Sequence, residues 1–155
     1  MFLKKYLILS ITLLLFIGCS KTEESSTVKI AKKDIPKKII MLFVTQPHCP
    51  SCDELEKSMQ LKAPSKLIKN YFEVKKVNIG EKLPDGLTPP NGTPTVYFLG
   101  YKDELLVEPM LGEKDEVGLM MFLEDALLEF KNLYSVDLQE KEEKKSETDI
   151  SNISN

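Results

Sequence analysis

Two cysteines, Cys49 and Cys52, lie two residues apart in the stretch QPHCPSCDELEK. Such a pair can be a structural disulfide, part of a metal site or a reversible redox couple. A structural bridge over so short a loop would add little stability, because entropic stabilisation by a disulfide grows with the length of the closed loop. The spacing therefore favours a couple whose disulfide forms and breaks in use.

The neighbouring residues predict different roles for the two thiols. Cys49 follows an apolar run and precedes Pro50, a residue that suits the first turn of a helix. Backbone N–H groups and the helix dipole at such a position favour the thiolate form of Cys49, an effect that Asp53 and Glu54 would moderate. Cys52 falls one turn inside the predicted helix, where it can resolve a mixed disulfide formed at Cys49.

His48 is the only histidine of the chain and directly precedes Cys49. When protonated, it could favour the Cys49 thiolate electrostatically. His48, Cys49 and Cys52 are also three ligand types that suit Cu(I) or Zn(II). Adjacent residues seldom direct both side chains to one ion, and the chain offers no second histidine. We therefore expect no resident metal, and a Cu(I)- or Zn-binding metal carrier remains an alternative function.

The segments around the cysteines alternate between strand-like and helix-like patterns. This order predicts an α/β fold in which helices flank a central mixed sheet. The expected strands are residues 38–45, 74–79, 95–99 and 104–107. The expected helices are residues 50–62, ended by Pro64, and residues 115–134, with a short helical turn from Ser65. In the last helix, the predicted apolar stripe consists of Val117, Met121 and Leu128 together with Phe122, Ala126 and Phe130.

The N-terminus reads as a targeting segment. Lys4 and Lys5 precede a mostly apolar run over residues 6–17, which predicts a secretory signal peptide over residues 1–18. The run is shorter than the ~20 residues that a membrane-spanning helix needs. The ending Phe16-Ile17-Gly18-Cys19 resembles the lipobox of bacterial lipoproteins. That resemblance implies acylation of Cys19, anchoring to a membrane and a periplasmic location, with Ser20 slightly favouring the outer membrane. The alternatives are a plain signal anchor or an ordinary signal cleavage.

Polar segments flank one expected domain. Residues 19–27 form the acylated cysteine and a polar tether, residues 28–134 form the folded unit, and residues 135–155 form a charged tail that we expect to be disordered. The formal net charge is −3, and it becomes −5 without residues 1–19, which hold two lysines and no acids. This acidic balance without a basic patch argues against a nucleic-acid partner.

Two motifs together resemble the thioredoxin superfamily. The run KIIMLFVTQPHCPSC is similar to the strand, turn and active-site motif of that family, and NGTPTVYF is similar to its cis-proline segment, with Pro94 placed 42 residues after Cys52. The resemblance covers about residues 28–134. It implies a thioredoxin-like fold, a cis Pro94, and a Thr93 whose backbone pairs with the substrate chain. His48, Pro50 and Ser51 would then border the substrate site. The alternative for Pro94 is an ordinary trans proline in a turn.

The sequence also departs from the family pattern. His48 stands in place of the usual tryptophan, and Phe43 stands at about the position of the buried acid that assists proton transfer in thioredoxin. Lys76 matches a lysine that lies near that acid in the family, so here it lacks the expected partner. These departures make a fast general reductase less expected.

The resemblance implies a membrane-anchored periplasmic thiol–disulfide oxidoreductase without an organic cofactor. We expect it to act on protein thiols or disulfides, with reduction of disulfides favoured, and to exchange electrons with a membrane or periplasmic redox partner. A thioredoxin-fold metal carrier and a non-catalytic adaptor are the alternatives.

Overall fold

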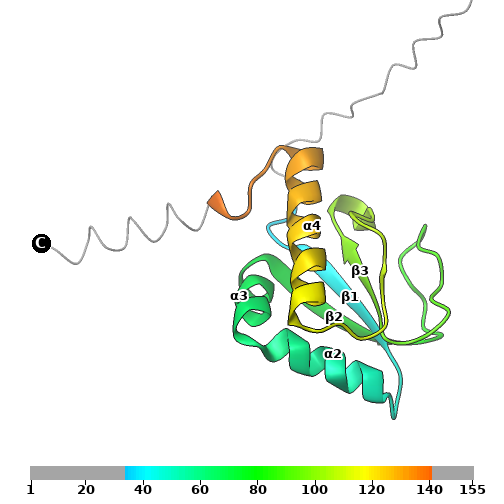
Figure 1. Ribbon diagram of the computed structural model, residues 1–155. Helices are drawn as coiled ribbons and strands as arrows, with labels where there is room; N and C mark the ends of the chain where they lie inside the picture. Colours follow the sequence, from blue (N-terminus) through cyan, green and yellow to red (C-terminus); the bar gives the residue numbers. More distant parts are fainter. Residues whose placement is uncertain (1–33, 141–155) are drawn as a thin grey trace, which may run out of the picture.

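The computed structural model describes residues 34–140, which form a mixed four-stranded sheet with the strand order β2-β1-β3-β4 (Figure 1). β1 pairs in parallel with β2 and antiparallel with β3, and β3 pairs antiparallel with β4. The predicted α/β fold with a central mixed sheet is confirmed. The elements are β1 (Ile39–Thr45), α2 (Pro50–Gln60), α3 (Lys62–Tyr71), β2 (Phe72–Asn78), β3 (Thr95–Leu99), the short 3₁₀ helix η2 (Tyr101–Asp103), β4 (Met110–Leu111) and α4 (Glu116–Tyr134).

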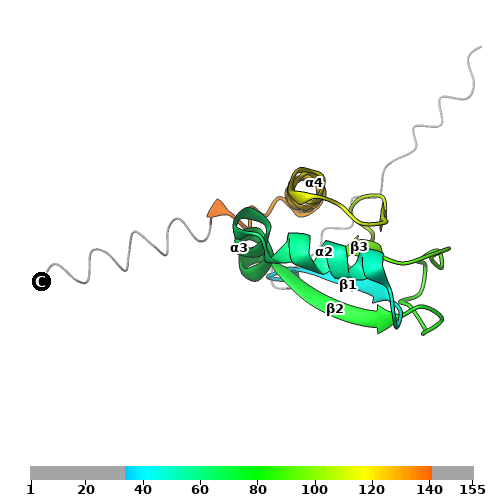
Figure 2. The same ribbon diagram turned by 60° about the horizontal axis from the view of Figure 1, so that its bottom comes forward.

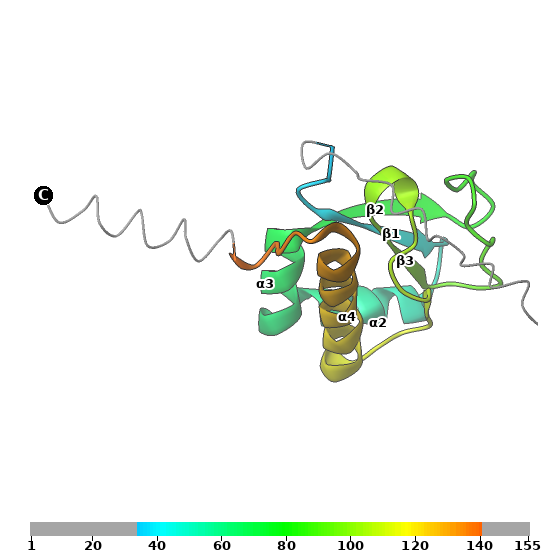
Figure 3. The same cartoon turned by 90° about the horizontal axis from the view of Figure 1, so that it is seen from above.

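The helices gather on one face of the sheet (Figure 2). Side chains alternate along β1, so that Ile39, Met41 and Phe43 belong to the larger core cluster beneath the helices. Leu42 and Val44 point to the other face and join a smaller cluster, which packs against residues of the loop between β2 and β3. Figure 3 shows the sheet above the helices, with this loop at the right-hand end of the sheet. Burial on both faces explains the continuous apolar run of β1.

The helical region after the cysteines is divided earlier than predicted, and its second part is a full helix and not a short turn. α2 ends at Gln60, Leu61 is extended, and α3 begins at Lys62. Pro64, expected to end the first helix, lies instead in the first turn of α3, where its missing N–H leaves no helical hydrogen bond unmade. α3 then runs directly into β2, so β2 starts at Phe72 and not at the predicted residue 74.

The fourth strand is displaced from its predicted position. Residues 104–107 were expected to form it, yet Leu105 makes only an isolated bridge with Leu99. The turn through η2 contains two residues with positive φ, Lys102 and Asp103, and the chain emerges from it without a continuous ladder. Regular pairing with β3 resumes only at β4, where Met110 lies opposite Val96.

The apolar stripe predicted for α4 is wrong in half of its members. Val117, Met121 and Leu128 are 69%, 61% and 57% exposed. The helix is apolar around much of its circumference, so helical spacing alone could not identify the face that packs. The buried residues of α4 are Leu119, Leu123, Ala126, Leu127, Phe130 and Tyr134.

The chain continues to pack against the domain after α4. Ser135 adopts a left-handed conformation, with φ of 52°, and caps the helix. Leu138 then returns to the core cluster and is 7% exposed. A hydrogen bond from Lys131 holds the pKa of Asp137 below its usual value. Six residues assigned to the charged tail therefore lie within the described structure.

The predicted signal peptide, the lipidation site Cys19 and the tether lie outside the described residues, as does the tail after residue 140. Within residues 34–140, no helix is both long and apolar enough to cross a membrane.

Candidate active site

The paired cysteines lie in the turn between β1 and α2. Gln46, Pro47 and His48 form an exposed connection after β1. His48 has a φ of 56°, a left-handed conformation that costs a non-glycine residue about 1 kcal/mol or more. This turn leads into Cys49, the N-cap of α2, which is followed by Pro50 in the first turn. The sequence prediction of a helix beginning behind Cys49 is confirmed.

Cys49 and Cys52 form a disulfide, with a Cα–Cα distance of 5.2 Å. Cys49 is 7% exposed and Cys52 is 2% exposed, so Cys49 is the slightly more accessible partner of two buried sulfurs. The backbone N–H of Cys52 donates to Cys49 Sγ at 3.2 Å. Such a donor at a helix N-terminus stabilises a thiolate at the same position once the disulfide is reduced.

Thr93, which is followed by Pro94 just before β3, faces this disulfide. Thr93 Oγ1 lies 3.5 Å from Cys49 Sγ. The peptide bond between Thr93 and Pro94 is cis, as the resemblance implied. Its position is fixed on both sides, because the Pro94 carbonyl accepts a hydrogen bond from the Gly112 N–H at 2.9 Å and Thr95 Oγ1 donates to the Gly92 carbonyl at 2.8 Å.

The remaining predicted site residues are sequence neighbours of the two cysteines. His48 and Pro50 are exposed, and Ser51 is partly exposed. The structure thus brings Thr93, followed by Pro94, next to the Cys49–Cys52 disulfide, and the other three residues adjoin the cysteines in the sequence. Among the described residues there is no group of three histidine, cysteine or acidic side chains that could hold a metal ion.

A charged pair near the site was missed by the sequence analysis. Lys76 Nζ lies 2.8 Å from Glu56 Oε1 and 5.8 Å from the centroid of the Phe43 ring. Lys76 therefore has a carboxylate partner, although it is not the one expected on β1. Glu56 comes from α2, four residues after Cys52, and that helical spacing was the available signal. Both side chains are substantially exposed, so the pair adds little stability.

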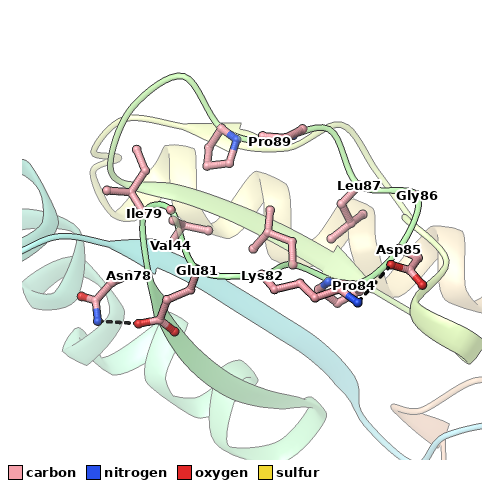
Figure 4. Close-up of a pocket in the computed structure, with 13 residues that line it drawn as sticks. Val44, Asn78, Ile79, Glu81, Lys82, Pro84, Asp85, Gly86, Leu87 and Pro89 are labelled. Carbon is pink, nitrogen blue, oxygen red and sulfur yellow. Dashed lines mark hydrogen bonds and ion pairs between the residues drawn. The ribbon is translucent and has the colours of Figure 1, made fainter.

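The loop before Thr93 encloses two hollows. One, of about 520 Å³, lies between Val44 and the loop over residues 78–90 (Figure 4). Leu87 and the other apolar side chains of the loop line it, and two polar contacts bridge its rim, between Asn78 and Glu81 and between Lys82 and Asp85. A second hollow of about 380 Å³ is bordered by Thr93, Pro94, Pro109 and Leu111. It offers an apolar surface directly beside the cis-proline.

These features define a chemical capability. A disulfide at a helix N-terminus can accept attack by an incoming thiolate, and its reduced form can attack a disulfide in the reverse direction. The buried second sulfur is held where it can displace a partner from Cys49. Both steps take place between sulfur atoms of the two partners.

Fold and site together define an α/β protein of thioredoxin-like architecture that carries a dithiol/disulfide couple. Two solved structures are similar to it. A disulphide isomerase from Xylella fastidiosa Temecula1 is 22% identical, with a TM-score of 0.46, over 57% of this chain and 77% of that one. The periplasmic thioredoxin SoxS from Paracoccus pantotrophus, in its reduced form, is 20% identical, with a TM-score of 0.46, over 59% of this chain and 98% of that one. No protein-family model and no curated protein matches the sequence.

Proposed function

We propose that this protein is a thiol–disulfide oxidoreductase that reduces protein disulfides in the periplasm while anchored to a membrane through acylated Cys19. The observation that carries the redox proposal is the Cys49–Cys52 disulfide at the start of α2, with Thr93 Oγ1 3.5 Å from Cys49 Sγ. The compartment and the anchor are supported by the N-terminal sequence, with its signal-like run and the lipobox-like ending at Cys19. The outer membrane is slightly favoured by Ser20.

The reaction begins from the reduced couple. The Cys49 thiolate attacks one sulfur of a substrate disulfide, which forms a mixed disulfide and releases one substrate thiolate. Cys52 loses its proton and attacks Cys49 Sγ, which releases the second substrate thiolate and forms the Cys49–Cys52 disulfide. The substrate gains two electrons, and its two thiolates take up protons. A membrane or periplasmic redox partner must then return two electrons to the couple.

The substrate chain would lie along Thr93. Hydrogen bonds at the Pro94 carbonyl and from Thr95 Oγ1 to the Gly92 carbonyl hold the chain around Thr93 beside the disulfide. The apolar hollow next to Pro94 can receive a side chain of the substrate. His48, Pro50 and Ser51 would border the opposite side of the substrate. Reduction is favoured over oxidation by Thr93 before the proline and by the short connection from the cysteine helices to β2, which holds no inserted helical lid.

The deciding experiment is the equilibrium reduction potential of the couple in the full-length chain. Redox buffers, alkylation and mass spectrometry of the peptide that contains Cys49 and Cys52 would report it without interference from Cys19. We expect a value near or below about −270 mV, the range of thioredoxin. A value near about −120 mV would mark an oxidant and reverse the proposed direction. Failure of the pair to exchange with any thiol buffer would reject the redox function itself.

A further inference from the structure

The outer edge of β2 has no neighbouring strand among the described residues. β2 stands at the end of the sheet order and lies at its margin in Figure 2. The Ile79 N–H donates to the Thr45 carbonyl of β1 at 2.8 Å. Because successive residues of a strand direct their amide groups to opposite sides, residues 73, 75 and 77 also face β1. The N–H and C=O groups of Val74 and Lys76 therefore point outward, away from the sheet.

An apolar groove runs beside this open edge on the helix-covered face. It has a volume of about 440 Å³ and is lined by residues of α2, α3 and β2 and by none of β1. Its apolar members Met59, Ile68 and Val74 come from the three different elements and are each only partly buried. Within residues 34–140, the outer margin of the domain thus combines backbone groups that pair with no strand and incompletely covered apolar side chains, the two features that a further strand would satisfy.

We propose that a second copy of this chain pairs with this edge, β2 against β2 in antiparallel orientation. The two sheets of four strands would become one continuous sheet of eight strands. The two-fold axis stands perpendicular to the sheet, so the helices of both copies lie on the same face and their apolar grooves adjoin. This inference does not depend on the redox function, since it involves neither the cysteines nor the residues around them.

The directions of the backbone groups restrict the possible registers. Only residues whose amide groups point outward can form the hydrogen-bonded pairs, so an outward residue such as Val74 must lie opposite another outward residue. Three central registers satisfy this condition. They place Glu73 opposite Glu73 of the second copy, Lys75 opposite Lys75, or Glu73 opposite Lys75.

Charge selects among these registers. Only the third register, in which Val74 lies opposite Val74, places opposite charges together. Because the dimer is symmetric, the Glu73–Lys75 pair occurs in it twice. Its Glu73–Lys75 pairs fall at the non-hydrogen-bonded positions, where side chains on neighbouring strands are closest. Within one copy, Lys75 Nζ already lies 3.5 Å from Glu73 Oε1, so both charges occupy the face of β2 on which they would meet their partners.

The lysines of β2 are consistent with this pairing. Edge-strand lysines commonly prevent unspecific strand addition. In one of the competing registers, Lys75 of one copy lies opposite Lys75 of the other and the two repel each other. In the register centred on Val74, each Lys75 lies opposite Glu73 of the other copy and its charge is neutralised. The same residue therefore disfavours open-ended aggregation and favours one closed, self-complementary dimer.

The test is analytical ultracentrifugation of the full-length chain in mild detergent, from micromolar to millimolar concentrations. We expect a reversible monomer–dimer equilibrium. Lys75→Glu places two like-charge pairs across the interface and should raise the dimer dissociation constant about tenfold. The double variant Glu73→Lys, Lys75→Glu exchanges the charges, keeps the net charge of the wild type and should restore the wild-type dissociation constant.

Cross-linking reports the register directly. In a Cys49→Ser, Cys52→Ser background, Val74→Cys should form an intermolecular disulfide through its own symmetric partner, whereas Val117→Cys, which is 69% exposed on α4, should not. A chain that stays monomeric at millimolar concentration overturns the proposal. This result is expected if another segment of the same chain, and not a second copy, covers the edge of β2. A dimer that neither Lys75→Glu weakens nor Val74→Cys cross-links also overturns it, because the copies would then meet elsewhere.

Discussion

The two strands that flank β1 differ sharply in how the rest of the molecule covers them. All five residues of β3 are buried, whereas of the seven residues of β2 only Phe72 is buried. β3 carries the cis-proline segment at its start and contributes to both hydrophobic clusters. β2 is attached to β1 along its full length but is covered on neither face as completely. The buried core and the candidate redox site are therefore concentrated on the β3 side, whereas the outer edge of β2 pairs with no other strand of residues 34–140.

The largest expected effect comes from truncating the core on the β3 side. Phe98 is fully buried, with its ring 6.0 Å from that of Phe72 and 6.4 Å from that of Phe122. Phe98→Ala should lower the free energy of unfolding by about 3–5 kcal/mol. The matched change on the β2 side, Val77→Ala, should lower it by about 1 kcal/mol, because Val77 is only partly buried. Urea denaturation followed by circular dichroism measures both, and equal losses would refute the contrast between the strands.

The next effect concerns the link between α4 and the end of β3. Tyr134 Oη donates to Glu104 Oε2 at 2.8 Å and accepts from the Tyr101 N–H at 3.0 Å. Tyr134→Phe should lower the free energy of unfolding by about 1–3 kcal/mol, because it leaves two polar partners without this hydroxyl. Urea denaturation near neutral pH, with Val117→Ala on the exposed face of α4 as the control, measures this loss.

The same tyrosine predicts a dependence on alkaline pH. Burial, and then the hydrogen bond with Glu104, raise the pKa of Tyr134 to about 12, above the usual value of 10. The folded state thus favours the neutral phenol. Its stabilising contribution is complete below pH 10 and is lost as the pH rises through about 12. Burial also raises the pKa of Tyr97, but this residue is present in both proteins. The difference in the free energy of unfolding between the wild type and Tyr134→Phe should therefore become smaller as the pH rises from 10 to about 12, as urea denaturation at each pH would measure.

A smaller effect is expected at the charged pair on the β2 side. Glu56→Gln and Lys76→Met should each change the free energy of unfolding by less than about 1 kcal/mol, since the two side chains are 35% and 49% exposed. The reduction potential of the cysteine pair should shift little. A large shift in both variants would mean that the pair acts on the redox couple and that the β2 side contributes to the site.

The smallest effect is expected at the turn before the cysteines. His48 has a φ of 56°, which glycine adopts without strain. His48→Gly should therefore be more stable than His48→Ala by up to about 1 kcal/mol. The two variants should have the same reduction potential, because both lack the imidazole. A difference between their potentials would show that the backbone of the turn, and not its side chain, tunes the couple.

Sequence motifs made the candidate site predictable, but the packing face of α4 and the partner of Lys76 could not be predicted in this way. The CxxC spacing and the Thr93-Pro94 segment predicted which residues meet, since each is a local pattern with a fixed place in the fold. Which face of α4 packs depends on tertiary contacts that helical periodicity does not contain, and Met121 was misplaced for that reason. The partner of Lys76 was missed because helical spacing places Glu56 on the same side of α2 as Cys52 but does not show which residue of β2 lies opposite it.

The return of Leu138 to the core has a practical consequence for where the chain can be cut or extended. Helix α4 looks like the natural end of the domain, but a protein that stopped at Tyr134 would expose the apolar surface that Leu138 covers. A fluorescent fusion or an affinity tag attached after residue 140 would leave this closure in place. The same fusion attached at Ser135 would replace the segment that carries Leu138, so the apolar surface beneath Leu138 would be exposed. A loss of solubility of that fusion would then result from the position of the junction and not from the protein that was fused.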